Sequence, residues 1–382
     1  MNHYSNLYAS TKIDMEVAVR INPSRKLIEF SIQNYEDVDI ECSRISIATN
    51  YIDENGYFIV RRHISIRDQV VKANDFHVVP ERGQEIIDSL EGQYSNPRIR
   101  DFHGDINAKC IKRPGFLEMC HDDSITQEQK KTIKGLKRIV SETSCFNAYI
   151  KLNELKELSL AYTDISDLIP LRNLYNLKYL NIAENPVSDI SPLTELTSLE
   201  KLYAHDTLVN DISSLAKLTK LTTLYLGNTR VSDIRPLAGL GNLLELHLGW
   251  TQITEIRPLS ELTNLVKLYL QGTPVRNLNP IFELSHLLYL SLAATRVNDI
   301  SPLADLTNLA VLNLFEAQVN DISPLRGLTK LVRLNIAATR VNDISPLADH
   351  SKLKWLDARN TQVISRDVEW LKQRLPDCQI KP

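Results

Sequence analysis

A period of 22 residues constrains the fold of this 382-residue chain more than any other feature. The segment TRVNDISPLADLTNLAVLNL at 295–314 has near copies at 229–248 and 339–350. A leucine recurs at every step of this period, at Leu158, Leu180, Leu202, Leu224, Leu246, Leu268, Leu290, Leu312, Leu334 and Leu356. No single stretch of this length can bury a core of its own, so the repeats must stack into one continuous core.

Each repeat reads L-x-x-L-x-[LIA]-x-x-T and then continues as in VSDISPL (187–193). The alternation around the second leucine predicts a short strand with one buried face. The aspartate can hydrogen-bond its own backbone two residues on, and proline is tolerated in the first turn of a helix. We therefore expect each repeat to be a strand, a turn and a tight return segment.

This period and leucine pattern are typical of leucine-rich repeats. Over about 145–380 the sequence resembles the 22-residue bacterial repeats of the internalin type. The resemblance implies a right-handed leucine-rich repeat solenoid of ten coils, with a parallel β-sheet on the concave side. It also implies a non-enzymatic module that binds a partner protein on that side, as internalin-like proteins bind host-cell proteins.

The sequence departs from the internalin pattern at the end of the strand, where the family's usual asparagine is a threonine in most coils. Asn185 and Ala317 are the exceptions among the ten. A threonine hydroxyl both donates and accepts hydrogen bonds, so we expect a modified hydrogen-bond ladder along the coils.

A helical segment at each end of the repeats (151–364) is predicted to close the core. At 124–150, Ser124 and Gln127 fit a capping box. The apolar face of this helix consists of Ile133, Leu136, Ile139 and Val140. The C-terminal cap at 365–382 presents Val368, Leu371 and Leu375 to the last coil.

The region before the repeats lacks their leucine pattern and contains β-rich stretches. It predicts a small, mostly-β sandwich-like domain at 1–105, followed by a connector at 106–123. Its β-rich stretches are 15–21, 27–32, 45–49, 57–66 and 75–79. Several short strands at near-regular spacing favour an antiparallel sandwich.

Charge and hydropathy exclude some classes of function. The net charge is −3, and no broad field of Lys and Arg suggests a nucleic-acid partner. No stretch approaches the roughly 20 apolar residues of a membrane span, so membrane insertion is not expected. The N-terminus lacks a basic segment followed by an apolar run, which predicts a cytoplasmic protein or one secreted without a classical signal peptide.

The five cysteines are scattered and form no C-x-x-C pair: Cys42, Cys110, Cys120, Cys145 and Cys378. Reduced thiols are the expectation. The densest possible metal ligands are His103, Cys110, Cys120 and His121. Their spacing fits no zinc finger, so we interpret them as coincidence and expect neither a metal nor a cofactor.

The candidate partner-binding residues lie on the concave face. The residue between the two buried positions of L-x-L faces this side, and in four consecutive coils it is an aromatic or a histidine. With their neighbours, the candidates are Tyr203, His205, Tyr225, His247, Trp250, Tyr269, Tyr289 and Phe315. Clustered exposed aromatics are typical of binding hot spots. The alternatives are that cross-strand aromatic pairs only stabilise the sheet, and that Trp250 folds over the neighbouring coil.

A second column is acidic, with members Asp167, Asp189, Asp211, Asp233, Glu255, Asn277, Asp299, Asp321 and Asp343. Single carboxylates along a ladder lack the six to eight converging oxygens that calcium prefers. This column is predicted to cap turns.

An enzymatic alternative places a catalytic centre in residues 1–123, with the repeats selecting the substrate. Cys120 and Asp122 match the C-x-D nucleophile motif of bacterial ubiquitin ligases that carry leucine-rich repeats. In those ligases a large helical domain after the repeats carries the motif, whereas here it precedes a capping helix. The sequence therefore favours a non-enzymatic role, with thiol-dependent, ligase-like chemistry at Cys120 as the alternative, and it does not identify the partner.

Overall fold

The computed structural model describes residues 15–22, 27–34, 39–52, 58–71, 101–113 and 115–382. The chain divides into two compact units, 1–123 and 124–382, which we describe separately.

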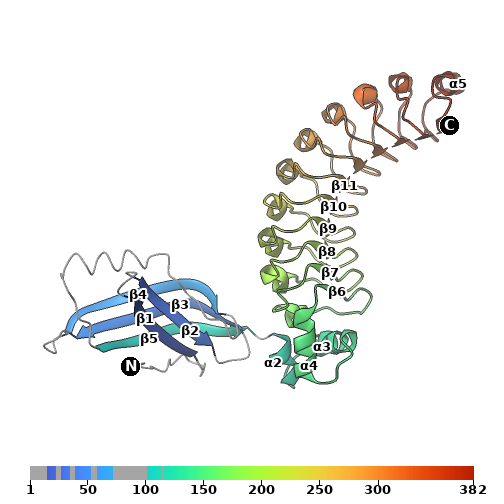
Figure 1. Ribbon diagram of the computed structural model, residues 1–382. Helices are drawn as coiled ribbons and strands as arrows, with labels where there is room; N and C mark the ends of the chain where they lie inside the picture. Colours follow the sequence, from blue (N-terminus) through green and yellow to red (C-terminus); the bar gives the residue numbers. More distant parts are fainter. Residues whose placement is uncertain (1–14, 23–26, 35–38, 53–57, 72–100, 114) are drawn as a thin grey trace. The chain divides into compact units, whose positions relative to one another are not determined.

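The first unit is built from antiparallel strands (Figure 1). β1 (Met15–Asn22) pairs with β2 (Leu27–Asn34), and β3 (Asp39–Ile52) lies between β4 (Phe58–Val71) and β5 (Asp101–Arg113). A short helix, α2 (Phe116–His121), follows. β5 runs through residues predicted as connector, because its backbone pairs with β3 along its full length. The predicted strand at 75–79 lies outside the described residues, and the sandwich packing stays a prediction.

Two helices, α3 (Gln127–Ile139) and α4 (Cys145–Glu154), begin the second unit. The predicted capping box is wrong by two residues: the Gln129 N–H donates to Thr126 Oγ1 (3.1 Å) and the Thr126 N–H donates to Gln129 Oε1 (3.0 Å). Both Ser124 and Thr126 satisfy the sequence pattern, but only Thr126 adopts the extended backbone directly before the helix. Ile133 and Leu136 are buried as predicted, whereas Ile139 is 41% exposed.

The repeats form one parallel sheet of eleven strands along one side of an arc (Figure 1). The strands are β6 (Glu157–Ser159), β7 (Tyr179–Asn181), β8 (Lys201–Tyr203), β9 (Thr223–Tyr225), β10 (Glu245–His247), β11 (Lys267–Tyr269), β12 (Tyr289–Ser291), β13 (Val311–Asn313), β14 (Arg333–Asn335), β15 (Trp355–Asp357) and β16 (Gln379–Lys381). Coils are numbered from the one that contains β6. The ten predicted coils account for β6 to β15, and the C-terminal cap adds β16, which pairs with β15.

Short 3₁₀ helices form the opposite side of coils 1 to 9: η1 (Ile169–Leu171), η2 (Ser191–Glu195), η3 (Ser213–Lys217), η4 (Arg235–Leu237), η5 (Arg257–Glu261), η6 (Asn279–Ile281), η7 (Ser301–Leu303), η8 (Ser323–Gly327) and η9 (Ser345–Leu347). The repeated leucines lie between sheet and helices, and the strand leucines of all ten coils are almost completely buried. α5 (Ser365–Arg374) closes the far end with Val368 and Leu371, and Leu375 follows, all three buried as predicted.

The acidic column caps turns as predicted at eight of its nine positions, and Glu255 is the member that forms no such bond with the described residues. Oδ1 of Asp189, for example, accepts the N–H of Ser191 at 2.8 Å, directly where η2 begins. The same bond recurs at Asp167, Asp211, Asp233, Asn277, Asp299, Asp321 and Asp343. Each carboxylate or amide oxygen thus satisfies a backbone donor that a helix start leaves unpaired.

The threonine column differs from the prediction, because seven of its eight hydroxyls stay within their own coils. Within the described residues, only the Thr163 hydroxyl also reaches the next coil, at Asn185 Oδ1 (3.4 Å). Thr229 Oγ1 donates to the carbonyl of Leu226 at 2.6 Å, three residues back, and the other threonines of the column do the same. Asn185 crosses between coils: its amide donates to the Leu160 carbonyl and accepts the Ile165 N–H. The longer amide side chain bonds backbone groups of both coils, whereas the column hydroxyls donate to a carbonyl of their own coil.

Candidate functional site

An unbroken stack of aromatic rings crosses the concave face of coils 2 to 7. Its ring centroids are separated by 5.3 Å for Tyr179–Tyr203, 4.7 Å for Tyr203–Tyr225 and 5.2 Å for Tyr225–His247. The stack continues with 4.6 Å for His247–Tyr269 and 4.5 Å for Tyr269–Tyr289. The parallel register places these residues on neighbouring strands, so their side chains meet at the spacing of the sheet. We call these six residues the aromatic ladder.

Hydrogen bonds and burial hold the ladder in place. The Tyr225 hydroxyl donates to Glu245 Oε1 at 2.5 Å, and Lys267 Nζ lies 3.2 Å from the other oxygen of Glu245. Partial burial and the bond to Glu245 raise the pKa of Tyr225 well above its usual range. Burial lowers the pKa of His247, which keeps its imidazole neutral at pH 7. The rings therefore present a neutral, partly apolar surface to solvent.

Trp250 lies beside the ladder and is 60% exposed. It occupies the position just before the column threonine, where every coil has a left-handed backbone, with φ of 60° at Trp250. Its ring covers Gly272, which has the same position in the next coil, and a Cβ at Gly272 would overlap that ring. The predicted alternative that Trp250 folds over the neighbouring coil is thus confirmed, while its outer face remains open to solvent.

Two more glycines allow side chains to lie against the backbone here. A Cβ at Gly249 would be 2.5 Å from Gln271 Nε2, and one at Gly227 would be 2.8 Å from His247 Nδ1. The surrounding hollow has a volume of about 550 Å³ and is lined by His205, Asp206, Tyr225, Gly227, Asn228, His247, Gly249 and Trp250. Buried atoms without hydrogen-bond partners, among them His247 Nδ1 and Gln271 Oε1, lie on this face.

The structure brings together most of the predicted partner-binding residues. Tyr203, Tyr225, His247, Tyr269 and Tyr289 are in the ladder, and His205 contacts Tyr225 with a centroid distance of 6.1 Å. Phe315 is exposed, and among the described residues no ring contact joins it to the ladder.

Sequence reasoning missed three contributors to the concave face. Tyr179 begins the ladder from the first residue of its strand, a column that the L-x-L argument did not use. Gln271 covers Gly249. Trp355 has Arg333 and Lys381 over its ring at 5.1 and 5.6 Å.

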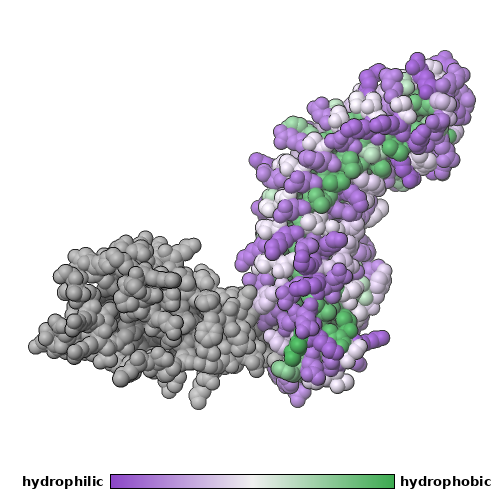
Figure 2. All heavy atoms as spheres, viewed as in Figure 1, coloured by the Kyte–Doolittle hydropathy of each residue, from purple (hydrophilic) through white to green (hydrophobic). Residues whose placement is uncertain are grey.

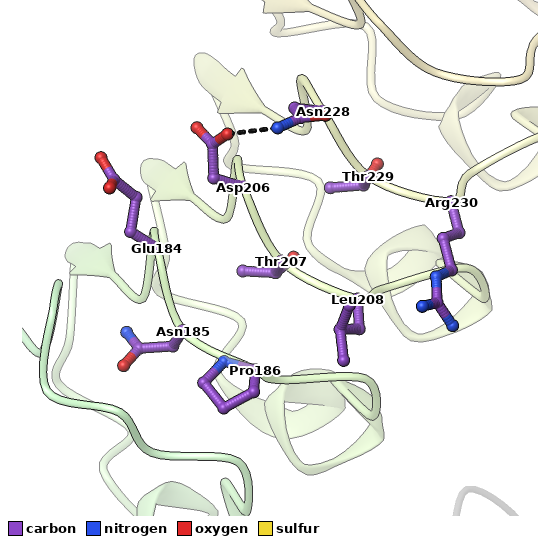
Figure 3. A pocket seen from close by; sticks show the side chains of 9 residues that line it. All are labelled: Glu184, Asn185, Pro186, Asp206, Thr207, Leu208, Asn228, Thr229 and Arg230. Atoms are coloured by element: carbon purple, nitrogen blue, oxygen red, sulfur yellow. Dashed lines mark hydrogen bonds between the residues drawn. The ribbon is translucent and has the colours of Figure 1, made fainter.

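A second hollow, of about 540 Å³, opens next to the first at the exits of the strands. Figure 3 shows its lining, with Glu184, Asp206 and Asn228 projecting from successive coils. Elsewhere in the repeats the surface in view is largely hydrophilic, with apolar patches that follow the coils (Figure 2).

The expectation of reduced thiols is wrong for Cys120 and Cys145, which are both disulfide-bonded. The spacing of the two cysteines matches no recurrent motif, so the sequence carries no signal for this. A disulfide-bonded sulfur is neither a thiolate nucleophile nor a metal ligand. This removes Cys120 from the metal set that was interpreted as coincidence. Within the described residues, no helix has the length and hydropathy needed to cross a membrane.

Comparison with known proteins confirms the class that the period and the fold define. A family model described as Leucine Rich repeats (2 copies) matches residues 153–195 and 197–239. The chain thus contains leucine-rich repeats. Comparison with curated protein sequences gives no match.

Solved structures share the solenoid fold. An internalin, InlF of Listeria monocytogenes str. 4b F2365, aligns with a TM-score of 0.57 and 24% identity over 70% of this chain and 91% of its own. The Leptospira interrogans protein LIC12759 has a TM-score of 0.58 and 23% identity over 62% of each chain. The ectodomain of the Arabidopsis thaliana receptor kinase GASSHO1/SCHENGEN3, solved with CASPARIAN STRIP INTEGRITY FACTOR 2, has a TM-score of 0.50 and 18% identity over 59% of this chain and 32% of its own. The predicted internalin-like architecture is confirmed at the level of the fold.

Proposed function

We propose that the chain is a non-enzymatic interaction module and that the concave face of coils 3 to 6 binds a partner protein. The observation that carries the proposal is the open outer face of Trp250 beside a hollow lined by His205, Tyr225 and His247. Large rings that are already held in place lose little conformational freedom on binding, which is why they dominate interface energetics. The solenoid fold supports this mode, because repeat proteins use their extended concave surfaces for binding.

Stacking alone explains the ladder tyrosines but not Trp250. Each inner ring of the aromatic ladder stacks on two other rings, and each end ring stacks on one. These contacts stabilise the sheet whether or not a ligand binds. Trp250 has Gly272 beneath it and solvent above. A partner that covers this ring would bury apolar area that the free protein leaves in water.

The test compares Trp250→Ala with the triple variant Tyr225→Ala, Trp250→Ala, Tyr269→Ala. Phe282→Ala is the matched control, because Phe282 is 52% exposed at the end of η6, on the opposite face. Wild-type protein retrieves partners by pull-down, and affinity for the purified partner is then measured for each variant. Trp250→Ala should weaken binding by about 2 kcal/mol and the triple variant should abolish it.

Thermal unfolding of each variant separates lost binding from lost structure. Folded Trp250→Ala and triple-variant proteins that both keep full affinity would rule out the concave face as the binding surface. Loss of affinity in Phe282→Ala would move the surface to the 3₁₀ side.

The alternative of an enzyme with its centre in residues 1–123 loses its named nucleophile, because Cys120 is disulfide-bonded. No specific observation in the described residues favours another catalytic group there.

We also propose that the protein acts in an oxidising environment, which favours the second of the two expected locations, secretion without a classical signal peptide, over the cytoplasm. Disulfides persist in such compartments and are rare in the reducing cytoplasm. Alkylation of protein taken from its source cells, followed by mass spectrometry, tests this. Peptides that contain Cys120 and Cys145 should be labelled only after reduction, and labelling without reductant would contradict the proposal.

A further inference from the structure

Three metal-ligating side chains converge where the strands of coils 2 and 3 end. The carboxylates of Glu184 and Asp206 and a ring nitrogen of His205 all lie within 4.8 Å of one another. The repeat itself causes this proximity. Glu184 and Asp206 occupy the same left-handed position in successive coils, and the Glu184 N–H donates to the His205 carbonyl at 3.1 Å.

His205 departs from what the repeat usually places at its position. The position of His205 is alanine or glycine in six of the ten coils: Ala161, Ala183, Gly227, Gly249, Ala293 and Ala337. A histidine at this position therefore has no packing role common to the coils. In coil 8, Glu316 occupies the same repeat position as Glu184. The residue of the next coil that corresponds to His205 is Ala337, which has no metal-binding side chain.

Side chains of the flanking coils orient both carboxylates. The Tyr162 hydroxyl hydrogen-bonds Glu184, and this bond raises the pKa of Tyr162. Asn228 Nδ2 donates to Asp206 Oδ1 at 2.5 Å, as Figure 3 shows. Such outer contacts fix ligating carboxylates in known metal sites.

The imidazole of His205 has an unsatisfied nitrogen, which distinguishes this cluster from a pair of surface carboxylates. Its Nδ1 is buried and has no hydrogen-bond partner among the described residues, and one of its two ring nitrogens lies near both carboxylates. Ligands bound at about 2.1 Å in a tetrahedral site are about 3.4 Å apart. A small closure of the three groups would therefore bring them onto one ion.

We propose that Glu184, His205 and Asp206 bind a divalent transition metal ion of the zinc type. One imidazole nitrogen and two carboxylate oxygens are a ligand set that suits such ions better than calcium, which prefers oxygen ligands only. Three protein ligands leave at least one coordination position open. Asp206 lines both hollows, the one on the concave face and the one at the strand exits, so the proposed metal site adjoins the surface proposed to bind a partner.

Calorimetric titration of the chelator-treated full chain with Zn²⁺ tests the site, and Co²⁺ absorption reports on the ligand set. His205→Gln and Asp206→Asn should each weaken one equivalent of Zn²⁺ binding by at least about tenfold, because each removes a direct ligand. Glu316→Gln and His286→Gln are matched controls: Glu316 shares the repeat position of Glu184, and His286 is an exposed histidine that bonds the Thr263 carbonyl.

The site is supported if His205→Gln and Asp206→Asn lose Zn²⁺ affinity while both control variants keep it. Equal Zn²⁺ binding in wild type and the cluster variants would overturn it, as would no binding to wild type below millimolar Zn²⁺. Glu184→Gln provides a further variant if His205→Gln proves unstable in thermal unfolding. The partner-binding test does not involve these substitutions, so the two proposals can fail separately.

Discussion

At the scale of single residues, the position before the column threonine shows how a repeat tolerates variation. Its backbone is left-handed in every coil, yet it holds residues as different as Trp250, Gly272 and Ala294. Ala294 shows that a Cβ is accepted there at φ 54°. Gly272 is therefore explained by its neighbour rather than by its own backbone, because the ring of Trp250 fills the space that a side chain would take.

Gly272→Ala should lower the free energy of unfolding by about 1–2 kcal/mol, because the Trp250 ring must move off the new Cβ. In a Trp250→Ala background the same change should cost far less. Urea unfolding of the four proteins gives a double-mutant cycle with an expected coupling of about 1 kcal/mol. An equal cost in both backgrounds would show that the backbone, and not the ring, requires glycine.

At the scale of elements, eight of the nine 3₁₀ helices begin at a side chain that accepts the first free N–H, and η5 is the exception among the described residues. The Arg235 side chain lowers the pKa of Asp233 to about 2, and the Ser301 and Ser345 N–H groups lower the pKa of Asp299 and Asp343. In coil 6 the uncharged Asn277 does the same work with a bond of 2.9 Å to the Asn279 N–H. The cap thus requires a hydrogen-bond acceptor, and the negative charge of aspartate is not essential to it.

These lowered pKa values predict how the stability of the fold decreases at acidic pH, which we call the acid limb. A carboxyl whose pKa is lower in the folded than in the unfolded chain stabilises the fold above its unfolded pKa, and this contribution is lost as the pH falls through the folded pKa. The melting temperature should therefore fall between about pH 4 and about pH 2. Replacing Asp233, Asp299 and Asp343 by asparagine should flatten this fall while the caps persist. An unchanged acid limb would show that other carboxylates cause it.

At the scale of the whole molecule, a solenoid depends on its ends because each coil contacts only its neighbours. α3 closes the first end: Thr132 Oγ1 donates to the Asp167 carbonyl at 2.7 Å, and Gln129 Nε2 donates to Asp167 Oδ2 at 2.9 Å. α5 and β16 close the other end, with Leu371 completely buried.

Leu371→Ala should destabilise the C-terminal coils by about 2–5 kcal/mol, because it leaves a cavity under α5. Hydrogen exchange should then show lost protection in β14 to β16 before β6 to β8, because stability in a repeat array is local. Leu244→Ala, at a position that is 45% exposed, is the control and should change neither end. Uniform loss along all strands would mean that the solenoid opens as one cooperative unit.

The sequence by itself determined the solenoid, the buried leucines and the turn caps, because a 22-residue period repeats the same local hydrogen bonds and the same register in every coil. The column that faces the concave side followed from the same alternation, so Tyr203, Tyr225, His247 and Tyr269 were predicted together. Only the tertiary structure decided what the irregular residues do. The fit of Trp250 over Gly272 and the convergence of Glu184, His205 and Asp206 depend on side-chain directions and neighbour sizes across coils. The choice of Thr126 as helix cap depends on where the backbone is extended directly before the helix. A one-dimensional pattern does not contain that information, because it records which residues recur and not how unlike residues meet.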